Sequence, residues 1–574
     1  KNPPAEYRGA PFWGWNGILD NELMEQQIDD FEKMGFGGFH IHSRIGLKDE
    51  YLGKKFLEAV KHCHSYACEK GMQVYLYDED KWPSGYGGGR VTEDEAYRAR
   101  YLLFSPHMHQ EGKYDRGLAP SNRLTENGCL TLLGVYQVEL KNGKLAGYKR
   151  IAASEEAMKG KEMSEGRGEQ GQLWYAYLVV TDKLPWFNNQ AYVDTLNPEA
   201  TGKFLETSYE PYYKILGQEF SRTVPSIFTD EPQFTKMQSL RKGDVPEEVG
   251  IPYTDRMERD FQELYKESLL GRLPEIFWNL EDGRTSCIRY RYLNLAADEF
   301  SRNYCGVLGK WCEAHNIMLT GHLMEEASLE SQLRSVGDAM RSYKYFQMPG
   351  IDILADAREY TTAKQAQSVA RQMGRGGTVS ELYGVTNWDF DFRGHKLQGD
   401  WQAALGVSLR VPHLAWMYMG GESKRDYPAP IDGHSPWFER YSILEDYFAR
   451  VGMAMARGKA VVHVAVIHPI ESMFMEMGPL RETAGKRKLL EQQFQDLTRW
   501  LLFGLIDFDF LSEALLPEIG AEAADGFLRV GEMDYTTVIV PELTTIRKST
   551  LEVLRDFGSS GGEILVLGEL PGYM

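Results

Sequence analysis

Two acidic residues each end a short β-branched run, and together they could perform acid–base chemistry. Glu231 follows a run that begins at Ile227, and Glu381 follows a run that begins at Thr378. In a parallel barrel, the residues that follow the strands converge on one catalytic face. A pair of carboxylates on such a face is the minimum requirement for hydrolysis of a glycosidic bond. The alternative is structural, because either carboxylate could cap a helix or pair with an arginine.

The neighbours of the two carboxylates predict a different role for each. Asp230 directly precedes Glu231, and repulsion between like charges, together with burial, would raise the pKa of Glu231 as a general acid requires. Glu381 would be the second carboxylate, acting as a nucleophile if the pair is close or as a base for water if it is farther apart. We therefore predict Glu231 and Glu381 as the catalytic residues.

Other polar and aromatic residues gather at the ends of the predicted strands, where they would line a sugar cleft. Charged side chains bond to sugar hydroxyls, and flat rings cover the apolar faces of a sugar. The residues predicted to bind substrate are His40, His42, Arg44, Asp78, Asp80, Trp82, Asp230, His322, Glu325 and Trp388.

The acidic residues at this mouth outnumber what a neutral sugar can balance. A calcium ion held by carboxylate oxygens would relieve their repulsion. The predicted metal ligands are Glu325, Glu326 and Asp78. Arg44 or Arg358 could supply the same neutralising charge without a metal, so both alternatives stay open. No organic cofactor is expected, because the glycine run 85–89 lacks a phosphate-binding pattern; we interpret it as a mobile loop over the cleft.

The first 459 residues alternate short apolar runs with amphipathic helices, which is typical of a parallel sheet. Eight runs in one series predict an α/β fold, a (β/α)₈ TIM barrel. Residues 107–190 carry short strand signals without a long helix, and we expect them to form a β-rich insertion in the barrel. The predicted barrel strands cover residues 10–15, 38–42, 73–78, 226–229, 317–322, 351–354, 378–380 and 413–418.

The pattern changes at residue 460, where a longer and almost wholly apolar run begins. Further runs follow near residues 507–510, 537–541 and 563–567, with helical segments between them. This alternation predicts a doubly wound, flavodoxin-like or amidotransferase-like α/β domain over residues 460–574, which the sequence does not complete. The expected division is therefore a catalytic barrel over 1–459 and a second domain over 460–574.

Charge and cysteine content restrict the partners and the compartment. The net charge of −19 argues against nucleic acid or an anionic membrane as a partner. A carbohydrate substrate is expected, and the sequence does not determine the oligomeric state. The six scattered cysteines fit reduced thiols and favour the cytoplasm. The alternative is secretion, if a signal peptide preceded Lys1 and has been removed.

Four segments resemble the catalytic module of α-L-rhamnosidase-like glycoside hydrolases of family 106. They are residues 11–16 (PFWGWN), 35–44 (GFGGFHIHSR), 77–85 (YDEDKWPSG) and 229–231 (TDE). The resemblance covers roughly residues 8–460, and it implies an inverting enzyme with calcium in its active site, Glu231 as acid and Glu381 as base. Residues 460–574 resemble a class I glutamine-amidotransferase-like domain, but this tail holds no cysteine nucleophile, which implies a structural role.

The sequence also bears on three other functions. The segment Thr229–Pro232 is also similar to the Asn-Glu-Pro acid/base motif of retaining β-glycosidases, which keeps a β-galactosidase-like enzyme open. A catalytically inactive carbohydrate-binding protein would be expected to lack one of the two glutamates, and both are present. A metal-dependent aldolase or isomerase would need a lysine base or a phosphate-binding loop, and the regions around Gly384 and Gly420 do not form a convincing one.

Overall fold

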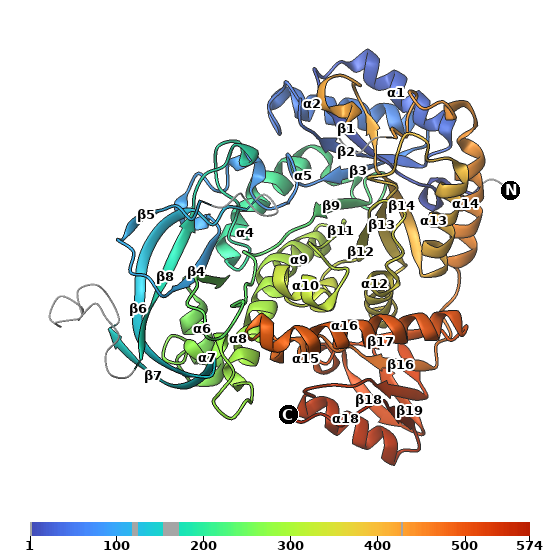
Figure 1. The fold of residues 1–574 in the computed structure, drawn as a ribbon. Coiled ribbons are helices and arrows are strands. Elements are labelled where there is room, and N and C mark those ends of the chain that lie inside the picture. Colours follow the sequence, from blue (N-terminus) through green and yellow to red (C-terminus); the bar gives the residue numbers. More distant parts are fainter. Residues whose placement is uncertain (1–2, 118–123, 153–170, 426–428) are drawn as a thin grey trace.

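The computed structural model describes residues 3–117, 124–152, 171–425 and 429–574. Parallel strands and their helices form the larger body, and a smaller α/β body follows it at the C-terminal end (Figure 1). The predicted fold class is thus confirmed. The barrel strands are β1 (Phe12–Trp15), β2 (Gly38–Ser43), β3 (Gln73–Tyr77), β9 (Ser226–Asp230), β11 (Met318–His322), β12 (Gly350–Ile353), β13 (Thr378–Leu382), β14 (Val407–Pro412) and β15 (Ala415–Trp416).

The barrel strands pair in two parallel sheets. One has the order β11-β9-β3-β2-β1-β15, and the other has the order β12-β13-β14. On one side, the amide of Met348 donates to the carbonyl of Leu319 at 3.3 Å and links the segment before β12 to β11. At the other junction between the two sheets, β14 continues directly along the chain into β15. The predicted eighth strand at 413–418 contains β15, which pairs with β1, but β14, which pairs with β13 from Val407, was not predicted. Ser408 and Arg410 interrupt the apolar run there and hide the strand.

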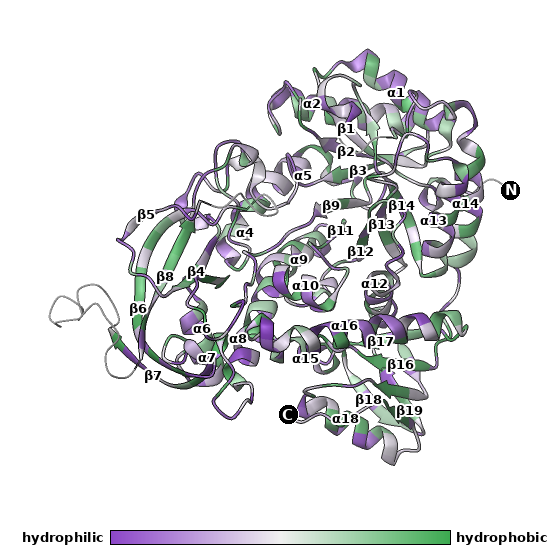
Figure 2. Ribbon diagram, in the orientation of Figure 1, coloured by the Kyte–Doolittle hydropathy of each residue, from purple (hydrophilic) through white to green (hydrophobic). Residues whose placement is uncertain are grey.

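Side chains of the barrel strands alternate between the interior and the surrounding helices, as the pleat requires. Tyr77, Phe228 and Val379 belong to the apolar cluster inside the barrel. Asp230 and Glu381 lie two residues beyond Phe228 and Val379, so they point to the same interior side. Asp78 follows Tyr77 directly and points the other way, toward the helices. Figure 2 shows that β13 and β14 are largely hydrophobic below this polar end.

Helix α1 buries one apolar face, which Met24, Ile28, Phe31 and Met34 form. Asp20 caps α1, because its side chain accepts a hydrogen bond from the amide of Leu23, and Gly35 ends the helix with a φ of 85°. The barrel helices are α1 (Asn21–Met34), α2 (Lys54–Glu69), α4 (Pro198–Phe204), α5 (Glu210–Leu216), α6 (Met257–Tyr265), α7 (Pro274–Phe277), α8 (Cys287–Phe300), α9 (Gly306–Ala314), α10 (Leu329–Ser335), α11 (Ala339–Tyr343), α12 (Tyr360–Gln372), α13 (Phe392–Ala404) and α14 (Ser442–Met455).

An antiparallel sheet follows β3 and forms a separate lobe (Figure 1). It begins before residue 107, and it also recruits a strand from beyond β9, which sequence alternation alone did not indicate. Its order is β10-β4-β8-β6-β5, with β7 paired to β6. The strands are β4 (Arg100–Ser105), β5 (Gly112–Tyr114), β6 (Gly128–Lys141), β7 (Lys144–Ala152), β8 (Gln172–Thr181) and β10 (Val249–Pro252).

The C-terminal body has a parallel sheet of order β17-β16-β21-β22, with α16 packed against α10 and α12 of the barrel. A small antiparallel sheet, β18-β19-β20, was not predicted. Among the described residues, no helix combines the length and apolar character needed to cross a bilayer. The elements are β16 (Val464–Ile467), α15 (Ile470–Met475), α16 (Leu480–Phe503), β17 (Phe508–Leu511), α17 (Leu516–Ile519), β18 (Ala521–Ala524), β19 (Phe527–Val530), β20 (Met533–Tyr535), β21 (Thr537–Val540), α18 (Lys548–Ser559) and β22 (Glu563–Val566).

Candidate active site

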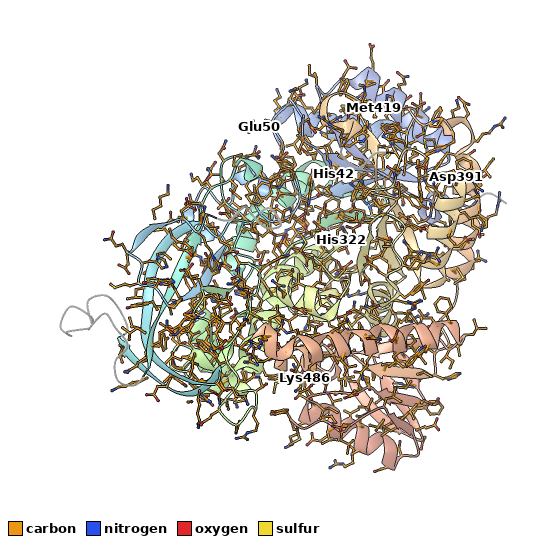
Figure 3. The ribbon with its side chains drawn as sticks, in the orientation of Figure 1. His42, Glu50, His322, Asp391, Met419 and Lys486 are labelled. Atoms are coloured by element: carbon orange, nitrogen blue, oxygen red, sulfur yellow. The ribbon has the colours of Figure 1, made fainter. Side chains whose placement is uncertain are left out.

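Three polar side chains meet inside the barrel at the ends of β9, β11 and β13. His322 Nε2 lies 2.9 Å from Glu381 Oε2 and 3.4 Å from Asp230 Oδ1. All three residues are at least nine-tenths buried. Figure 3 shows His322 near the centre of the molecule, beside the barrel strands. The predicted convergence of strand ends therefore brings Glu381, Asp230 and His322 into contact.

Glu231 and Asp352 also lie close to His322. One donor atom each of Glu231, His322 and Asp352 lies within 4.8 Å of the others. Glu231 has a φ of 49°, a conformation that costs a non-glycine residue on the order of 1 kcal/mol or more. Asp352 Oδ1 is buried and has no hydrogen-bond partner among the described residues. We call the five residues Asp230, Glu231, His322, Asp352 and Glu381 the acidic cluster.

The two predicted catalytic carboxyls have opposite pKa shifts. Burial, followed by the charge of Asp230, raises the pKa of Glu231 to about 8. Burial also acts to raise the pKa of Glu381, but the hydrogen bond from His322 and the charge of His413 outweigh it and leave that pKa below its usual value. At neutral pH, Glu231 therefore carries a proton and Glu381 is ionised, which separates an acid from a base.

His322 is the positive centre of the acidic cluster. Burial alone would lower its pKa, but the hydrogen bond to Glu381 and the charges of Asp230 and Asp352 raise the pKa of His322 well above its usual value. Burial and the charge of Glu381 raise the pKa of Asp230 to about 6, and the same two causes raise the pKa of Asp352 further. The imidazolium of His322 is thus the one positive charge among the four carboxyl groups of the acidic cluster.

The wall of the site beside β2 and β3 is built from stacked rings and one guanidinium group. The His42 ring stacks on Tyr77 with centroids 3.8 Å apart, and Tyr77 donates its hydroxyl to Asp230 Oδ2 at 2.5 Å. Arg44 Nη1 lies 3.3 Å from His42 Nε2, and the guanidinium lies 4.8 Å above the Trp82 ring. Three predicted binding residues, His42, Arg44 and Trp82, are therefore brought together beside the acidic cluster.

His40 lies deeper in the barrel than His42, two residues earlier on the same strand. Its Nδ1 bonds to the carbonyl of Ala10 at 2.9 Å, and its ring stacks on Tyr75. Burial lowers the pKa of His40 to about 3, so the ring stays neutral. His40 Nε2 has no partner among the described residues, but the side chain is completely buried and fits a supporting role under the site.

The three predicted metal ligands are not brought together. Asp78 faces the helices, where its carboxylate accepts hydrogen bonds from Ser84 Oγ at 2.6 Å and Tyr209 Oη at 2.8 Å. Glu325 pairs with Lys236 at 2.6 Å. Glu326 accepts the hydroxyl of Tyr343 and supports the backbone of β12. The alternation of side chains on β3 explains the misplacement of Asp78, since its neighbour Tyr77 points inward.

Among the described residues, those that could hold a metal form two sets that share His322. One set is Asp230, His322 and Glu381, and the other is Glu231, His322 and Asp352. Calcium prefers six to eight oxygen ligands, and imidazole is not among them. Because His322 already donates to Glu381, these sets fit a hydrogen-bonded cluster better than a calcium site.

Two further predicted binding residues lie at the rim of the mouth. Asp80 Oδ1 accepts a hydrogen bond from Ser43 Oγ at 2.8 Å, and Asp80 Oδ2 accepts one from Asn188 at 3.0 Å. Trp388 is 50% exposed in the segment between β13 and α13. Neither residue contacts the acidic cluster, so each would reach only a substrate that extends beyond it.

The glycine run is folded around a carboxylate that sequence reasoning missed. Glu79 is completely buried, and it accepts hydrogen bonds from the backbone amides of Asp80, Gly85, Gly87 and Gly88 at 2.7–3.0 Å. Burial still raises the pKa of Glu79 to about 8. The expected loop over the cleft is thus a compact turn packed into the protein, and its positive φ values require glycine.

Ser84, in the same turn, fixes the backbone next to Glu231. Its amide donates to the carbonyl of Asp230 at 2.7 Å, and its hydroxyl accepts from the amide of Asp230 at 2.8 Å. This contact holds the end of β9 where the chain enters the left-handed conformation of Glu231. Asp352 was missed for a different reason: an acidic residue between Ile351 and Ile353 in a predicted strand was a signal, but the strand was read only as apolar.

Comparisons with known proteins give structural likeness without close sequence relatives. No protein-family model matches the chain, and no curated protein is significantly similar to it. The structure resembles that of a rhamnosidase from Novosphingobium sp. PP1Y, with a TM-score of 0.67, 14% identity, and coverage of 100% of this chain and 70% of that one.

Two β-galactosidases also match. A GH42 β-galactosidase from G. stearothermophilus has a TM-score of 0.54 and 10% identity, with 98% of this chain and 72% of that one covered. A β-galactosidase from the haloarchaeon Halorubrum lacusprofundi has a TM-score of 0.51 and 12% identity, with 98% and 72% covered. Identities this low show the fold alone, and the fold of this chain is similar to the folds of that rhamnosidase and of these β-galactosidases.

Proposed function

We propose that this protein is a glycoside hydrolase that removes a terminal sugar by acid–base catalysis with Glu231 and Glu381. The observation that carries the proposal is the opposite protonation of two carboxyls around one imidazole. Glu231, with a pKa of about 8, holds a proton at neutral pH, and Glu381, hydrogen-bonded to His322, does not. Glycosidases need this combination on the two sides of the scissile bond.

In the proposed reaction, Glu231 donates its proton to the glycosidic oxygen as the bond to the anomeric carbon breaks. Glu381 takes a proton from a water molecule, whose oxygen attacks the anomeric carbon from the opposite face. The products are the leaving-group alcohol and a sugar of inverted configuration, with Glu231 ionised and Glu381 protonated until solvent exchange restores them. His322 keeps Glu381 ionised before attack, and Asp230 favours the protonated state of Glu231.

The proposed sugar is α-L-rhamnose and the proposed outcome is inversion. Support comes from the sequence resemblance to α-L-rhamnosidase-like enzymes, carried by residues 35–44 and 77–85, and from the match to a rhamnosidase structure. Calcium remains part of this proposal through the resemblance alone. Exhaustive chelation tests it: a bound ion requires that the rate and the melting temperature both fall and that added calcium restores them.

The second candidate is a retaining β-galactosidase-like enzyme. It is favoured by the segment Thr229–Pro232 and by the GH42 β-galactosidases among the structural matches. In that reaction Glu381 would attack the anomeric carbon and form a covalent glycosyl-enzyme, and Glu231 would act first as acid and then as base. The ionised state of Glu381 and the hydrogen bond that it accepts from His322 suit a nucleophile as well as a base.

A panel of p-nitrophenyl glycosides tests the proposal, followed by ¹H NMR of the first-formed product. Hydrolysis of the α-L-rhamnoside with an inverted first product is the expected result. Hydrolysis of the β-galactoside with retention would select the second candidate. If the folded protein hydrolyses neither the p-nitrophenyl glycosides of the panel nor the corresponding disaccharides, glycosidase activity is contradicted.

A further inference from the structure

The loops after β2 and β3 line a cavity at the rim of the barrel mouth. Its volume is about 470 Å³, within the range of small-molecule sites. Arg44 forms part of its wall, and Arg44 Nη1 lies 3.3 Å from His42 Nε2 in the wall of the candidate active site. The cavity and the candidate active site therefore share Arg44. Figure 3 shows Glu50, another wall residue, farther out than His42.

The lining of this cavity is polar and nearly balanced in charge. Its basic residues are Arg44, Lys81 and Arg90. Arg90 pairs with Glu50 at 2.7 Å, so part of this charge is already neutralised within the wall. The acidic residues that line it are Asp49, Glu50, Asp80 and Glu93. Such a lining offers donors and acceptors in several directions and favours a neutral, hydroxyl-rich ligand over an ion.

The cavity does not suit an aromatic or apolar group. Among the described residues that line it, Tyr51 is the only aromatic ring, and it is 7% exposed. Sites for apolar ligands are lined mainly by hydrophobic and aromatic side chains. The polar wall is also fixed in place, because Asn188 donates to Asp80 and accepts from Lys81 at 2.7 Å.

We infer that this cavity is a leaving-group subsite that binds a second sugar, so that the protein prefers an oligosaccharide to an aryl or alkyl glycoside as its substrate. This inference rests on the proposed function. The terminal sugar would occupy the acidic cluster, and the next sugar would extend past Arg44 into the cavity, with its hydroxyls bonded to Asp80, Lys81 and Asn188. The sugar in this subsite departs with the glycosidic oxygen after Glu231 has protonated it.

Filling the cavity tests the subsite. Ile45 lies in its wall and is 42% exposed, so Ile45→Trp adds bulk without disturbing the core. The substrates are p-nitrophenyl α-L-rhamnoside and rhamnosyl-glucose, or p-nitrophenyl β-galactoside and lactose if the panel selects galactose. The ratio of kcat/KM for the disaccharide to that for the aryl glycoside should fall about tenfold in Ile45→Trp, mainly through KM. Lys81→Met, which removes polar contacts and keeps length, should lower the ratio about fivefold.

The control is Ile443→Trp, the same substitution at a site that is 61% exposed on α14 and outside the cavity, which should leave the ratio unchanged. An unchanged ratio in folded Ile45→Trp, or an equal loss on both substrates, overturns the subsite while the glycosidase assignment survives. If wild-type protein cleaves neither member of either pair, the proposed function and the subsite fail together.

Discussion

Two glutamates lie just beyond parallel strands of this protein, one in the barrel and one in the C-terminal body, and the charges that surround them differ in sign. Glu231 borders three other carboxyls and one imidazole. Glu471, at the start of α15, accepts hydrogen bonds from Arg547 at 2.8 and 2.9 Å and from Arg341 at 2.9 Å. Burial would raise the pKa of Glu471, but the two arginines leave it below its usual value.

The difference shows that a glutamate just beyond a parallel strand can either stabilise the fold or hold a proton for catalysis. Around Glu471, cations from both bodies satisfy the charge, and Arg341 comes from α11 of the barrel, so the contact ties the two bodies together. Around Glu231, the charge is left uncompensated, and a proton remains bound. A satisfied carboxylate contributes structure, and an unsatisfied one retains a proton that it can donate. The following predictions test that distinction.

The largest expected effect is the loss of turnover in Glu231→Gln and in Glu381→Gln. Each substitution removes one member of the acid–base pair and changes side-chain volume little. We expect kcat to fall on the order of 10²–10⁴-fold in each variant, with an unchanged far-UV circular dichroism spectrum. Near-normal turnover in either folded variant would remove that residue from the mechanism.

The same substitution at Glu471 should act on stability and not on turnover. Glu471→Gln leaves Arg341 and Arg547 buried without their common carboxylate, which we expect to destabilise the protein by about 3 kcal/mol. The melting temperature should fall, and kcat per folded molecule should stay within about twofold of wild type. A loss of kcat comparable to that of Glu231→Gln, at unchanged stability, would mean that the C-terminal body takes part in the reaction.

Loss of the Ser84 hydroxyl should have an intermediate effect. Ser84→Ala leaves the buried amide of Asp230 without its acceptor, and we expect kcat to fall about tenfold with little change in KM, because Glu231 is displaced while substrate contacts remain. Ser301→Ala is the matched control, since it removes a buried serine hydroxyl that donates at 2.7 Å to the carbonyl of Arg341, away from the acidic cluster. If both variants lose kcat equally, Ser84 has no special positioning role.

The smallest effect concerns pH and stability. A pKa of about 8 for Glu231, against a usual value of 4.5, means that the folded state binds this proton more tightly than the unfolded chain. The contribution of Glu231 to the free energy of unfolding therefore falls as the pH rises from its usual pKa of 4.5 to its pKa of about 8 in the folded protein. Glu231→Gln should raise the melting temperature, and more so at pH 9 than at pH 5.

In wild type, kcat/KM should decline above an apparent pKa near 8 that belongs to the acidic cluster as a whole. A decline that begins well below neutrality would contradict the raised pKa.

Much of the barrel was predictable because its strands are short, apolar and ended by polar residues. All eight predicted strands overlap observed ones, and the convergence of Asp230, His322 and Glu381 followed from parallel topology alone. The strand β14 was not predicted, because Ser408 and Arg410 break its apolar run. Asp78 was misassigned because only the end of β3 was considered and not the side on which alternate residues lie.

Other features could not be predicted from sequence patterns. The hydrogen bonds of Glu79 go to glycine amides, which carry no side-chain signal, and Ser84 contacts a backbone 146 residues later in the chain. The strand β10 pairs with β4 across a similar separation. Local periodicity reports which face of an element is apolar, but it does not report which distant segment will cover that face. Such long-range contacts required the structure.

The turn around Glu79 also has a thermodynamic consequence for substrate binding. Its four amide hydrogen bonds determine the shape of the loop that carries Trp82 and Asp80 before any ligand arrives. A loop that must become ordered on binding loses conformational entropy and weakens affinity, whereas a preorganised loop avoids that loss. An internal carboxylate here takes the place that a bound anion occupies in other glycine-rich turns, so the rim of the mouth is already formed in the free protein. Sugar binding at this rim should therefore be accompanied by little conformational ordering of the loop.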